Sequence, residues 1–259
     1  MKIAVLGGSG FIGSVIVNYF TSKNYQVLSV GRADVTLTDY DSVASWLKTN
    51  RPDAIINCAT SGGKQRMGDA LLSDVQNNVS LFLNFLHNSK YFDKFINIGS
   101  GAEFDWLTNI DLAKEEDIMR VYPLDGYGYS KNVIARLCLT HPKFYTVRLF
   151  GCFDSREPDF RLFKKFIRGE ALTLSDRQFD YISSQDFNRV LEYHLNNHVV
   201  YKDINCVYEK KYYLSEILSN FRSVVIDTIN EKNYTGDGSK LASLGIPLLG
   251  LEKSIKEYK

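Results

Sequence analysis

The glycine-rich turn Gly7–Gly13, between a predicted strand and a predicted helix, constrains the fold more than any other stretch. Residues 2–6 are apolar and rich in branched side chains, as in a strand buried on both faces. Residues 14–20 carry apolar side chains at helical spacing. A glycine turn in this setting is typical of a dinucleotide-binding unit, and an ordinary strand-to-helix turn is the alternative.

The glycines have the spacing Gly-x-x-Gly-x-x-Gly rather than Gly-x-Gly-x-x-Gly. The first allows a tight turn, the second lets the backbone approach a pyrophosphate, and the third lets the helix pack closely on the strand. The free N–H groups of the first helical turn then face the phosphate charge. The predicted cofactor contacts in this turn are Gly7, Gly10, Phe11, Ile12 and Gly13.

Apolar strands alternate with helical patterns through the first 150 residues. The sequence predicts further strands at 26–30, 54–58, 95–98 and 144–150, and helices at 41–48, 70–87 and 127–139. Strands that alternate with helices through short loops form a parallel, doubly wound sheet. We therefore predict an α/β protein with a Rossmann-type sheet whose ligands lie beyond the carboxyl ends of its strands.

The pattern changes after residue 150. Shorter elements are predicted there, with helices at 160–168, 185–196 and 213–221, strands at 172–174, 180–183, 205–208 and 224–229, and a helical segment at 239–259. We predict a dinucleotide-binding domain over 1–150 and a small mixed α/β substrate-binding lobe over 151–259. No linker separates them, so we expect them to be interwoven, with part of 180–200 packed back on the sheet.

Composition narrows the class of protein. A net charge of +1 gives no general attraction to nucleic acid or to a membrane surface. No apolar run reaches the length of a membrane span, and no charged-then-apolar leader precedes the first strand. Four cysteines are scattered without paired spacing, which favours reduced thiols. We expect a cytoplasmic protein that binds neither nucleic acid nor membrane.

Three residues have the chemistry of a proton-transfer site. Tyr127 and Lys131 lie four positions apart on a predicted helix and therefore share a face. An ammonium group nearby favours the phenolate form of a tyrosine. Ser100 follows the strand 95–98 at the predicted ligand edge, where a hydroxyl can hold a carbonyl oxygen. We predict Ser100, Tyr127 and Lys131 as catalytic residues; the alternatives are a turn serine, a core tyrosine and a surface lysine.

With these residues the chain resembles the short-chain dehydrogenase/reductase superfamily, specifically its extended, nucleotide-sugar-modifying branch. The glycine spacing, Ser100 and Tyr127-x-x-x-Lys131 are the signature of that family. Residues 57–60, 77–79, 180–186 and 238–245 also look like family segments. Residues 31–39 are most similar to GDP-L-fucose synthases, and dTDP-4-dehydrorhamnose reductases are another relative. The resemblance implies a nucleotide-sugar substrate and dimerisation of two copies through the long helices.

Arg32, at the end of the strand 26–30, bears on the form of the cofactor. An NAD site would place a carboxylate there for the ribose 2′-OH, whereas an arginine accommodates a 2′-phosphate. NADP(H) is therefore favoured as the cofactor, with NAD as the alternative. For Arg32 itself, the alternative to a binding role is an exposed arginine on the surface. The resemblance implies further cofactor contacts at Asp34, Val35, Cys58, Ala59, Thr60 and Asn78.

The departures from the family pattern limit the reaction. Epimerising fucose synthases carry a cysteine two residues past the serine and a histidine in the following lobe. Here Ala102 replaces the cysteine, and no histidine lies between His141 and His194. Simple ketone reduction needs neither group.

Basic side chains are the candidates for holding a substrate diphosphate. Phe179 stands where relatives often have an arginine, and Arg177 could substitute for it. The predicted substrate-binding residues are Lys64, Arg161, Lys165 and Arg177, chosen from a larger set of charges that are mostly solvated surface.

His194 and His198 have the spacing of a helical metal pair. No carboxylate or cysteine nearby completes a ligand set, and a histidine near a helix C-terminus is favourable without a metal. We predict no metal site.

The leading hypothesis is NADPH-dependent reduction of a nucleotide-linked 4-keto-6-deoxy sugar, and the resemblance implies a setting in surface-polysaccharide synthesis. One alternative is a 4-epimerase or dehydratase that retains NAD. Another is a non-catalytic NAD(P) sensor of the same fold, although sensing needs none of the three catalytic residues.

Overall fold

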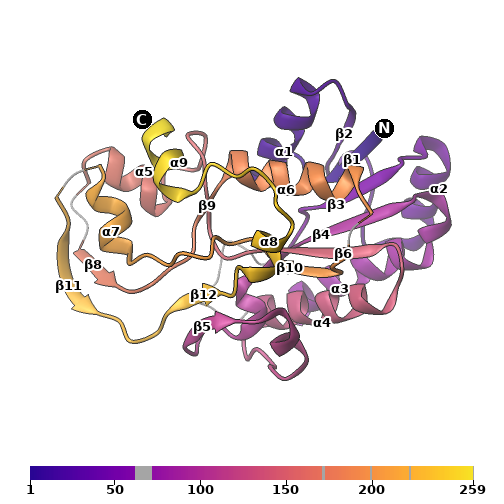
Figure 1. Cartoon of the computed structure of the whole chain (residues 1–259). Helices are drawn as coiled ribbons and strands as arrows, with labels where there is room; N and C mark the ends of the chain where they lie inside the picture. The colour runs from indigo at the N-terminus through magenta and orange to yellow at the C-terminus, as the bar shows by residue number, and fades with distance from the viewer. Residues whose placement is uncertain (62–71, 171–172, 199, 222, 259) are drawn as a thin grey trace.

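A six-stranded, all-parallel sheet forms the centre of the protein, here described from a computed structural model (Figure 1). The structure describes residues 1–61, 72–170, 173–198, 200–221 and 223–258. The sheet has the order β10-β6-β4-β3-β1-β2. Its strands are β1 Lys2–Leu6, β2 Gln26–Val30, β3 Ala54–Asn57, β4 Lys94–Ser100, β6 Phe144–Leu149 and β10 Asp203–Asn205. The predicted Rossmann-type α/β fold is confirmed.

The sheet has its topological switch point at β1. This strand pairs with β2 on one side and with β3 on the other, so the chain reverses its direction of winding there. Leu6, the last residue of β1, lies between Val30 and Asn57. In open sheets of this kind the ligand crevice lies beyond the carboxyl ends of the two strands that flank the switch point.

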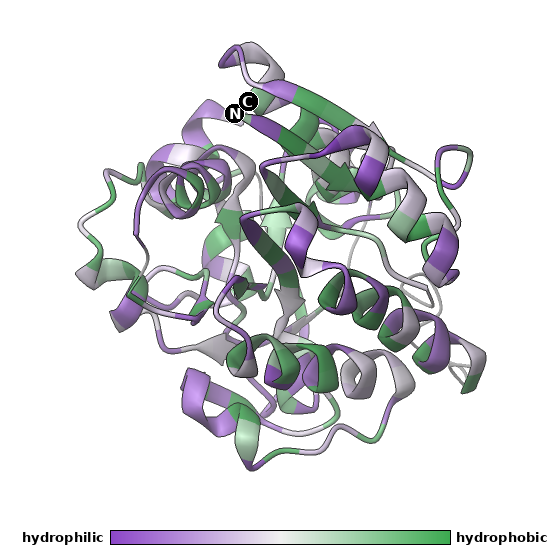
Figure 2. Ribbon diagram, turned by 90° about the vertical axis from the view of Figure 1, so that its right-hand side faces the viewer, coloured by the Kyte–Doolittle hydropathy of each residue, from purple (hydrophilic) through white to green (hydrophobic). Residues whose placement is uncertain are grey.

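Helices cover both faces of the sheet (Figure 1). On one face lie α1 (Phe11–Ser22) and α6 (Ser184–Asn196), whose apolar residues form one core cluster with the strands. On the other lie α2 (Tyr40–Asn50), α3 (Leu72–His87) and α4 (Gly126–Thr140). In Figure 2 the strands at the centre are mostly green, and the surrounding helices alternate between green and purple. This agrees with strands buried on two faces and helices buried on one.

The edge strand β10 differs from the expectation. The sequence predicts a strand at 205–208 within the lobe, whereas the structure has it at Asp203–Asn205, paired with β6 in the main sheet. Residues from both halves of the chain therefore complete one sheet. The two-residue shift has a physical reason, because the buried Asp203 and Asn205 are held by hydrogen bonds rather than by apolar contacts.

The rest of the C-terminal half forms a lobe at one end of the sheet (Figure 1). It contains α5 (Leu162–Ile167), α7 (Leu214–Ser219) and α9 (Leu251–Glu257), and the parallel strand pairs β7 (Cys152–Phe153) with β9 (Ile182–Ser183) and β8 (Thr173–Asp176) with β11 (Val225–Ile229). A third pair joins β5 (Ile110–Ala113) to β12 (Tyr234–Gly236).

Several lobe elements differ from the sequence prediction. The strand β5 was not expected, and α5 is shorter than the predicted 160–168. The closing segment is two short helices, α8 (Ser239–Ser243) and α9, rather than one. Pro247 and two glycines with positive φ, Gly245 and Gly250, lie between them and interrupt the helical backbone. Among the described residues, no helix is long and apolar enough to cross a membrane.

Candidate functional site

The glycine turn after β1 has the close packing that its spacing predicts. Gly7 has a φ of +72°, in the left-handed region, and its N–H donates to Val30 O at 2.9 Å. A Cβ on Gly13 would lie 2.1 Å from Gly7 O, so only glycine lets α1 begin this close to the turn. Gly10 is the N-cap and contributes no capping side chain. The first-turn N–H groups of α1 therefore have no side-chain acceptor at the cap.

The segment after β2 carries the predicted adenosine contacts. Arg32 is exposed and makes no hydrogen bond or ion pair within the described part of the chain. Asp34 accepts a hydrogen bond from Gly31 N at 2.8 Å, which closes the turn. Val35 is 5% exposed and packs in the core cluster under α2, so its side chain faces the core.

The loop after β3 closes the other side of the crevice. The backbone of Cys58 and Ala59 lies about 3 Å from the position that a Cβ on Gly7 would occupy. Asn78, from α3, is 4% exposed and accepts from Ser61 N at 2.7 Å. Its amide nitrogen donates to Ser130 Oγ on α4 at 3.1 Å. Asn78 thereby ties the loop that carries Thr60 to the helix that carries Tyr127 and Lys131.

Ser100 is the last residue of β4, which extends beyond the predicted strand 95–98 and so includes the serine that was expected to follow it. It is also the N-cap of the 3-10 helix Gly101–Phe104, with its Oγ accepting from Ala102 N at 3.3 Å. Because Oγ accepts there, the Ser100 hydroxyl hydrogen remains available for donation to another group.

Tyr127 and Lys131 lie at the start of α4, which Asp125 caps by accepting from Gly128 N at 2.8 Å. A Cβ on Gly128 would lie 2.6 Å from Ala102 O, so this glycine lets α4 approach the segment after Ser100. Lys131 is 4% exposed, and its Nζ donates to Ile98 O at 3.0 Å. One of its three N–H donors is thus used to hold the ammonium group at the end of β4.

These side chains line a single cavity of about 320 Å³ between the sheet edge and the lobe. The predicted residues at its wall are Ile12, Cys58, Thr60, Ser100, Tyr127, Lys131 and Arg161. The elements that supply them are α1, the loop after β3, β4, α4 and the segment before α5. The remaining predicted cofactor residues are not at the cavity wall: they lie along the glycine turn and the start of α1, after β2, in the loop after β3 and on α3.

Sequence reasoning missed part of the cavity wall. Phe150, Glu157, Phe163 and Tyr181 line it, and Phe179 does so as an apolar residue stacked on Tyr181 at 4.7 Å. The available signal was the aromatic residue Phe150 directly after the strand β6, at the predicted ligand edge of the sheet.

Of the predicted lobe cations, Arg161 is the one at the cavity wall. Its Nε donates to Glu157 at 3.0 Å, its Nη2 donates to Cys152 O at 2.8 Å, and its guanidinium lies 5.0 Å from the Phe11 ring centroid. The Arg177 guanidinium lies 5.2 Å from the ring centroid of Phe179, and neither Arg177 nor Lys165 lines the cavity. Lys64 lies outside the described residues.

Burial sets the electrostatics of the cavity. Burial raises the pKa of the Glu157 carboxyl, and the Arg161 guanidinium beside it opposes that rise. Burial raises the pKa of the Cys58 thiol to about 12, again against a nearby cation, Lys131. Cys58 is therefore a neutral wall residue at ordinary pH and not a thiolate nucleophile.

The two histidines at metal-like spacing lie on and just after α6. His194 is 1% exposed with Nδ1 2.8 Å from Val190 O, and burial lowers its pKa to about 4. Within the described ranges, no group of three or more His, Cys, Asp or Glu side chains is arranged to hold a metal ion.

Comparisons with known proteins identify the family and the fold of the chain. A sequence model described as the NAD dependent epimerase/dehydratase family matches residues 3–205. GDP-L-colitose synthase of Yersinia pseudotuberculosis is 26% identical over 145 residues, which are 53% of this chain and 46% of the relative. CDP-abequose synthase of the same organism is 27% identical over 175 residues, 61% of this chain and 58% of the relative. The matches thus span about half the length of these relatives.

Among solved structures, GDP-mannoheptose C4 reductase from Campylobacter jejuni with NADP bound superposes with a TM-score of 0.77. The match covers 98% of this chain and 96% of that one at 20% identity, so the likeness is one of fold.

Proposed function

Because this chain belongs to the NAD dependent epimerase/dehydratase family, we propose that it reduces the ketone of a nucleotide-linked 4-keto-6-deoxy sugar with NADPH. The observation that carries the proposal is the single cavity at the carboxyl edge of the sheet that Ser100, Tyr127 and Lys131 all line. Residues after 150 supply the opposite wall, and we assign 151–259 as the substrate-binding lobe of a two-part chain whose first part is 1–150, with α6 and β10 returning to the sheet of the first part.

The glycine turn fits a dinucleotide pyrophosphate. A Cβ at Gly13 would meet Gly7 O, and the backbone N–H groups at the start of α1 are uncapped by side chains, so the turn offers a cradle for a diphosphate. Gly7, Gly10, Phe11, Ile12 and Gly13 would hold it. When bound, the dinucleotide supplies the hydride that the ketone carbon accepts.

The chain's own residues handle the oxygen of the ketone. The Ser100 hydroxyl, with its lone pair engaged by Ala102 N, donates to the carbonyl oxygen and fixes it. Tyr127 gives its proton to that oxygen as charge develops there. Lys131 keeps two N–H donors beyond the one used for Ile98 O, and these favour the phenolate left on Tyr127.

The substrate diphosphate would lie against Arg161. An arginine has five N–H donors, and Arg161 uses one toward Glu157 and one toward Cys152 O, which leaves three for an oxyanion. Those two contacts and the Phe11 ring hold the guanidinium plane before the ligand arrives, which reduces the entropy lost on binding.

A panel of nucleotide sugars tests the function. The purified protein is mixed with NADPH and with dTDP-, GDP- or CDP-linked 4-keto-6-deoxy sugars, and NADPH consumption is followed by absorbance. We expect consumption with at least one substrate. Protein that copurifies with tightly held NAD and interconverts epimers without net consumption would replace this proposal by the epimerase alternative, and binding of NADPH without turnover of any substrate would favour the sensor.

Arg161→Gln is expected to raise the KM for the nucleotide sugar about 10–100-fold, since a charge-assisted hydrogen bond contributes roughly 1.5–3 kcal/mol. The KM for NADPH and the kcat should change little, because the diphosphate is held equally in ground and transition states. Arg156→Gln is the matched control: its ion pair with Asp154 is similar, but it does not line the cavity. An equal rise in KM in both variants would contradict the assignment.

Arg32→Glu is expected to reverse the cofactor preference, lowering kcat/KM for NADPH relative to NADH about 100-fold or more. The substitution removes charge-assisted hydrogen bonds to a 2′-phosphate and supplies an acceptor for a 2′-OH. Arg51→Glu makes the same charge change at another exposed site, after α2. If the two variants shift the ratio equally, the effect is one of overall charge, and the assigned role of Arg32 is wrong.

A further inference from the structure

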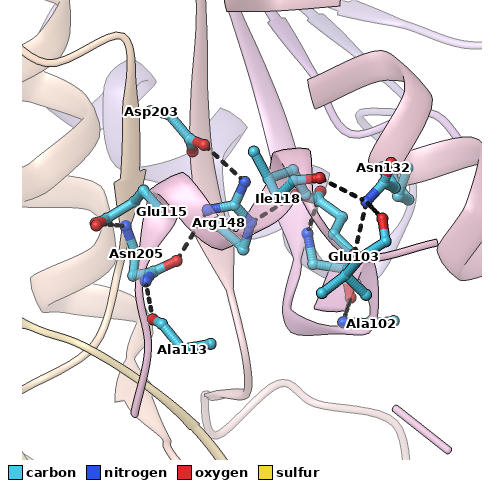
Figure 3. Close-up of polar contacts among 12 residues, drawn as sticks. Ala102, Glu103, Ala113, Glu115, Ile118, Asn132, Arg148, Asp203 and Asn205 are labelled. Carbon is cyan, nitrogen blue, oxygen red and sulfur yellow. Dashed lines mark hydrogen bonds and ion pairs between the residues drawn. The ribbon is translucent and has the colours of Figure 1, made fainter. Parts of the chain in front are cut away.

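A buried carboxylate, that of Glu103, accepts a hydrogen bond from the backbone of Ser100. Glu103 is 0% exposed, and its two oxygens have different partners. One accepts from Ser100 N at 2.8 Å, and the other accepts from Arg148 Nε at 2.5 Å (Figure 3). Glu103 therefore joins the backbone of Ser100 to Arg148 on β6.

Arg148 is itself held on every side. Its Nη2 donates to Asp203 at 2.9 Å and its Nη1 to Asn205 at 2.9 Å, both on β10, and it lies 4.8 Å from the Phe104 ring centroid. Figure 3 shows the guanidinium between Asp203 on one side and Glu103 on the other. Because Arg148 cannot shift without breaking these contacts, the Glu103 carboxylate has a fixed position.

The same segment is tied to the helix that carries the other two site residues. Asn132, next to Lys131 on α4, donates to Glu103 O at 2.9 Å and to Val121 O at 3.1 Å. The 3-10 helix after Ser100 is thus fixed through its side chain to the sheet and through its backbone to α4. A hydroxyl must be held in a fixed position if it is to donate a hydrogen bond to a carbonyl oxygen of the substrate.

We propose that Glu103 is the positioning residue of Ser100: its carboxylate, anchored on Arg148, holds the Ser100 backbone so that the hydroxyl meets the ketone oxygen. The inference rests on the proposed function. An ionised carboxylate is required because it accepts at both oxygens, whereas the isosteric amide accepts at only one. Burying the ionised Glu103 carboxylate costs desolvation free energy, and we assign the placement of Ser100 as the gain that offsets this cost.

Two isosteric variants of the same ion network separate this role from a structural one. Glu103→Gln leaves either Ser100 N–H or Arg148 Nε–H without an acceptor, and we expect kcat to fall about 10–100-fold with the KM for the nucleotide sugar and the Kd for NADPH within about 2-fold. Asp203→Asn removes a carboxylate charge beside the same guanidinium but keeps its anchoring contact, because only one oxygen of Asp203 accepts from Arg148 Nη2 and the amide oxygen can replace it. We expect its kcat to stay within about 2-fold of wild type.

Adding Glu103→Gln to Ser100→Ala tests whether the effect passes through the serine. If it does, the double variant has the kcat of Ser100→Ala alone within about 2-fold, because groups that act through each other are not additive. Multiplicative losses, equal losses in Glu103→Gln and Asp203→Asn, or an unchanged kcat in Glu103→Gln would each overturn the proposal.

Backbone amide exchange provides a readout that needs no turnover. Exchange of a peptide spanning 97–104 should be faster in Glu103→Gln than in wild type and Asp203→Asn, since Ser100 N–H loses its fixed acceptor. If wild type reduces no nucleotide sugar, the proposed function fails, and this exchange alone decides the Glu103–Ser100 coupling. Equal exchange in all three proteins would refute it.

Discussion

Tyr127→Phe is expected to lower kcat for ketone reduction on the order of 10²–10⁴-fold, the usual contribution of a positioned general acid. The phenylalanine keeps the ring in its place at the cavity wall and removes only the O–H that gives the proton. NADPH binding should therefore stay close to wild type, as measured by fluorescence titration. The loss appears in single-turnover rates as well as in steady state, because it concerns the chemical step.

Tyr129→Phe is the matched control for this variant. It makes the same change two residues along α4, at a side chain that is 43% exposed and does not line the cavity. Its kcat should equal that of wild type. Full activity in Tyr127→Phe would exclude the tyrosine as the acid, and loss of NADPH binding in that variant would assign the effect to the cofactor site instead.

Arg148→Met is expected to lower the free energy of unfolding by about 3–5 kcal/mol, because it leaves two carboxylates, Glu103 and Asp203, facing a site without a cation. Arg148 is 0% exposed and pairs with these carboxylates at 2.5 and 2.9 Å. Against a total stability of roughly 5–15 kcal/mol this is a large fraction. Urea unfolding followed by circular dichroism measures it.

The destabilisation should depend on pH. Burial raises the pKa of the Glu103 carboxyl, and in wild type the Arg148 guanidinium opposes that rise. Without the guanidinium, the folded variant holds a proton that the unfolded chain releases, so its stability falls as pH rises through the range above the unfolded pKa of about 4.3. The deficit against wild type should be smaller at about pH 5 than at about pH 8.

Arg120→Met is the surface counterpart. Its ion pair with Asp117 is 3.9 Å long and its side chain is 82% exposed, so we expect a change within about 0.5 kcal/mol and no added pH dependence. A deficit of similar size in both variants, or one that grows toward acid pH in Arg148→Met, would contradict the account of the buried charges.

The parts of the fold that could be predicted from sequence are those with short-range patterns. Gly7–Gly13 between a buried strand and a helix determines its own local geometry, and Tyr127 and Lys131 share a helix face through their spacing alone. The place of Ser100 at the ligand edge follows from the rule that the carboxyl ends of parallel strands lie together. The family resemblance rested on these same residues and is confirmed.

The rest depended on partners distant in sequence. β10 has three residues with two polar side chains, so apolar patterning misplaces it. An arginine inside the apolar strand Phe144–Leu149 was the available signal, because a buried cation requires buried carboxylates. No sequence pattern near Arg148 identifies these carboxylates as those of Glu103 and Asp203. Similarly, the number of free donors on Arg161 depends on Glu157 and Cys152 O, contacts that no periodicity reports.

The position of β10 has a consequence for the order of folding. Until residues 203–205 are available, β6 is an edge strand with unpaired backbone groups, and Arg148 lacks acceptors that lie 55 and 57 positions later in the chain. The N–H and C=O groups on that edge are satisfied only when the C-terminal half returns to the sheet. Closing so long a loop is slow compared with forming a helix. We therefore expect completion of the sheet to be a late event, with the backbone that holds Ser100 reaching its final rigidity only then.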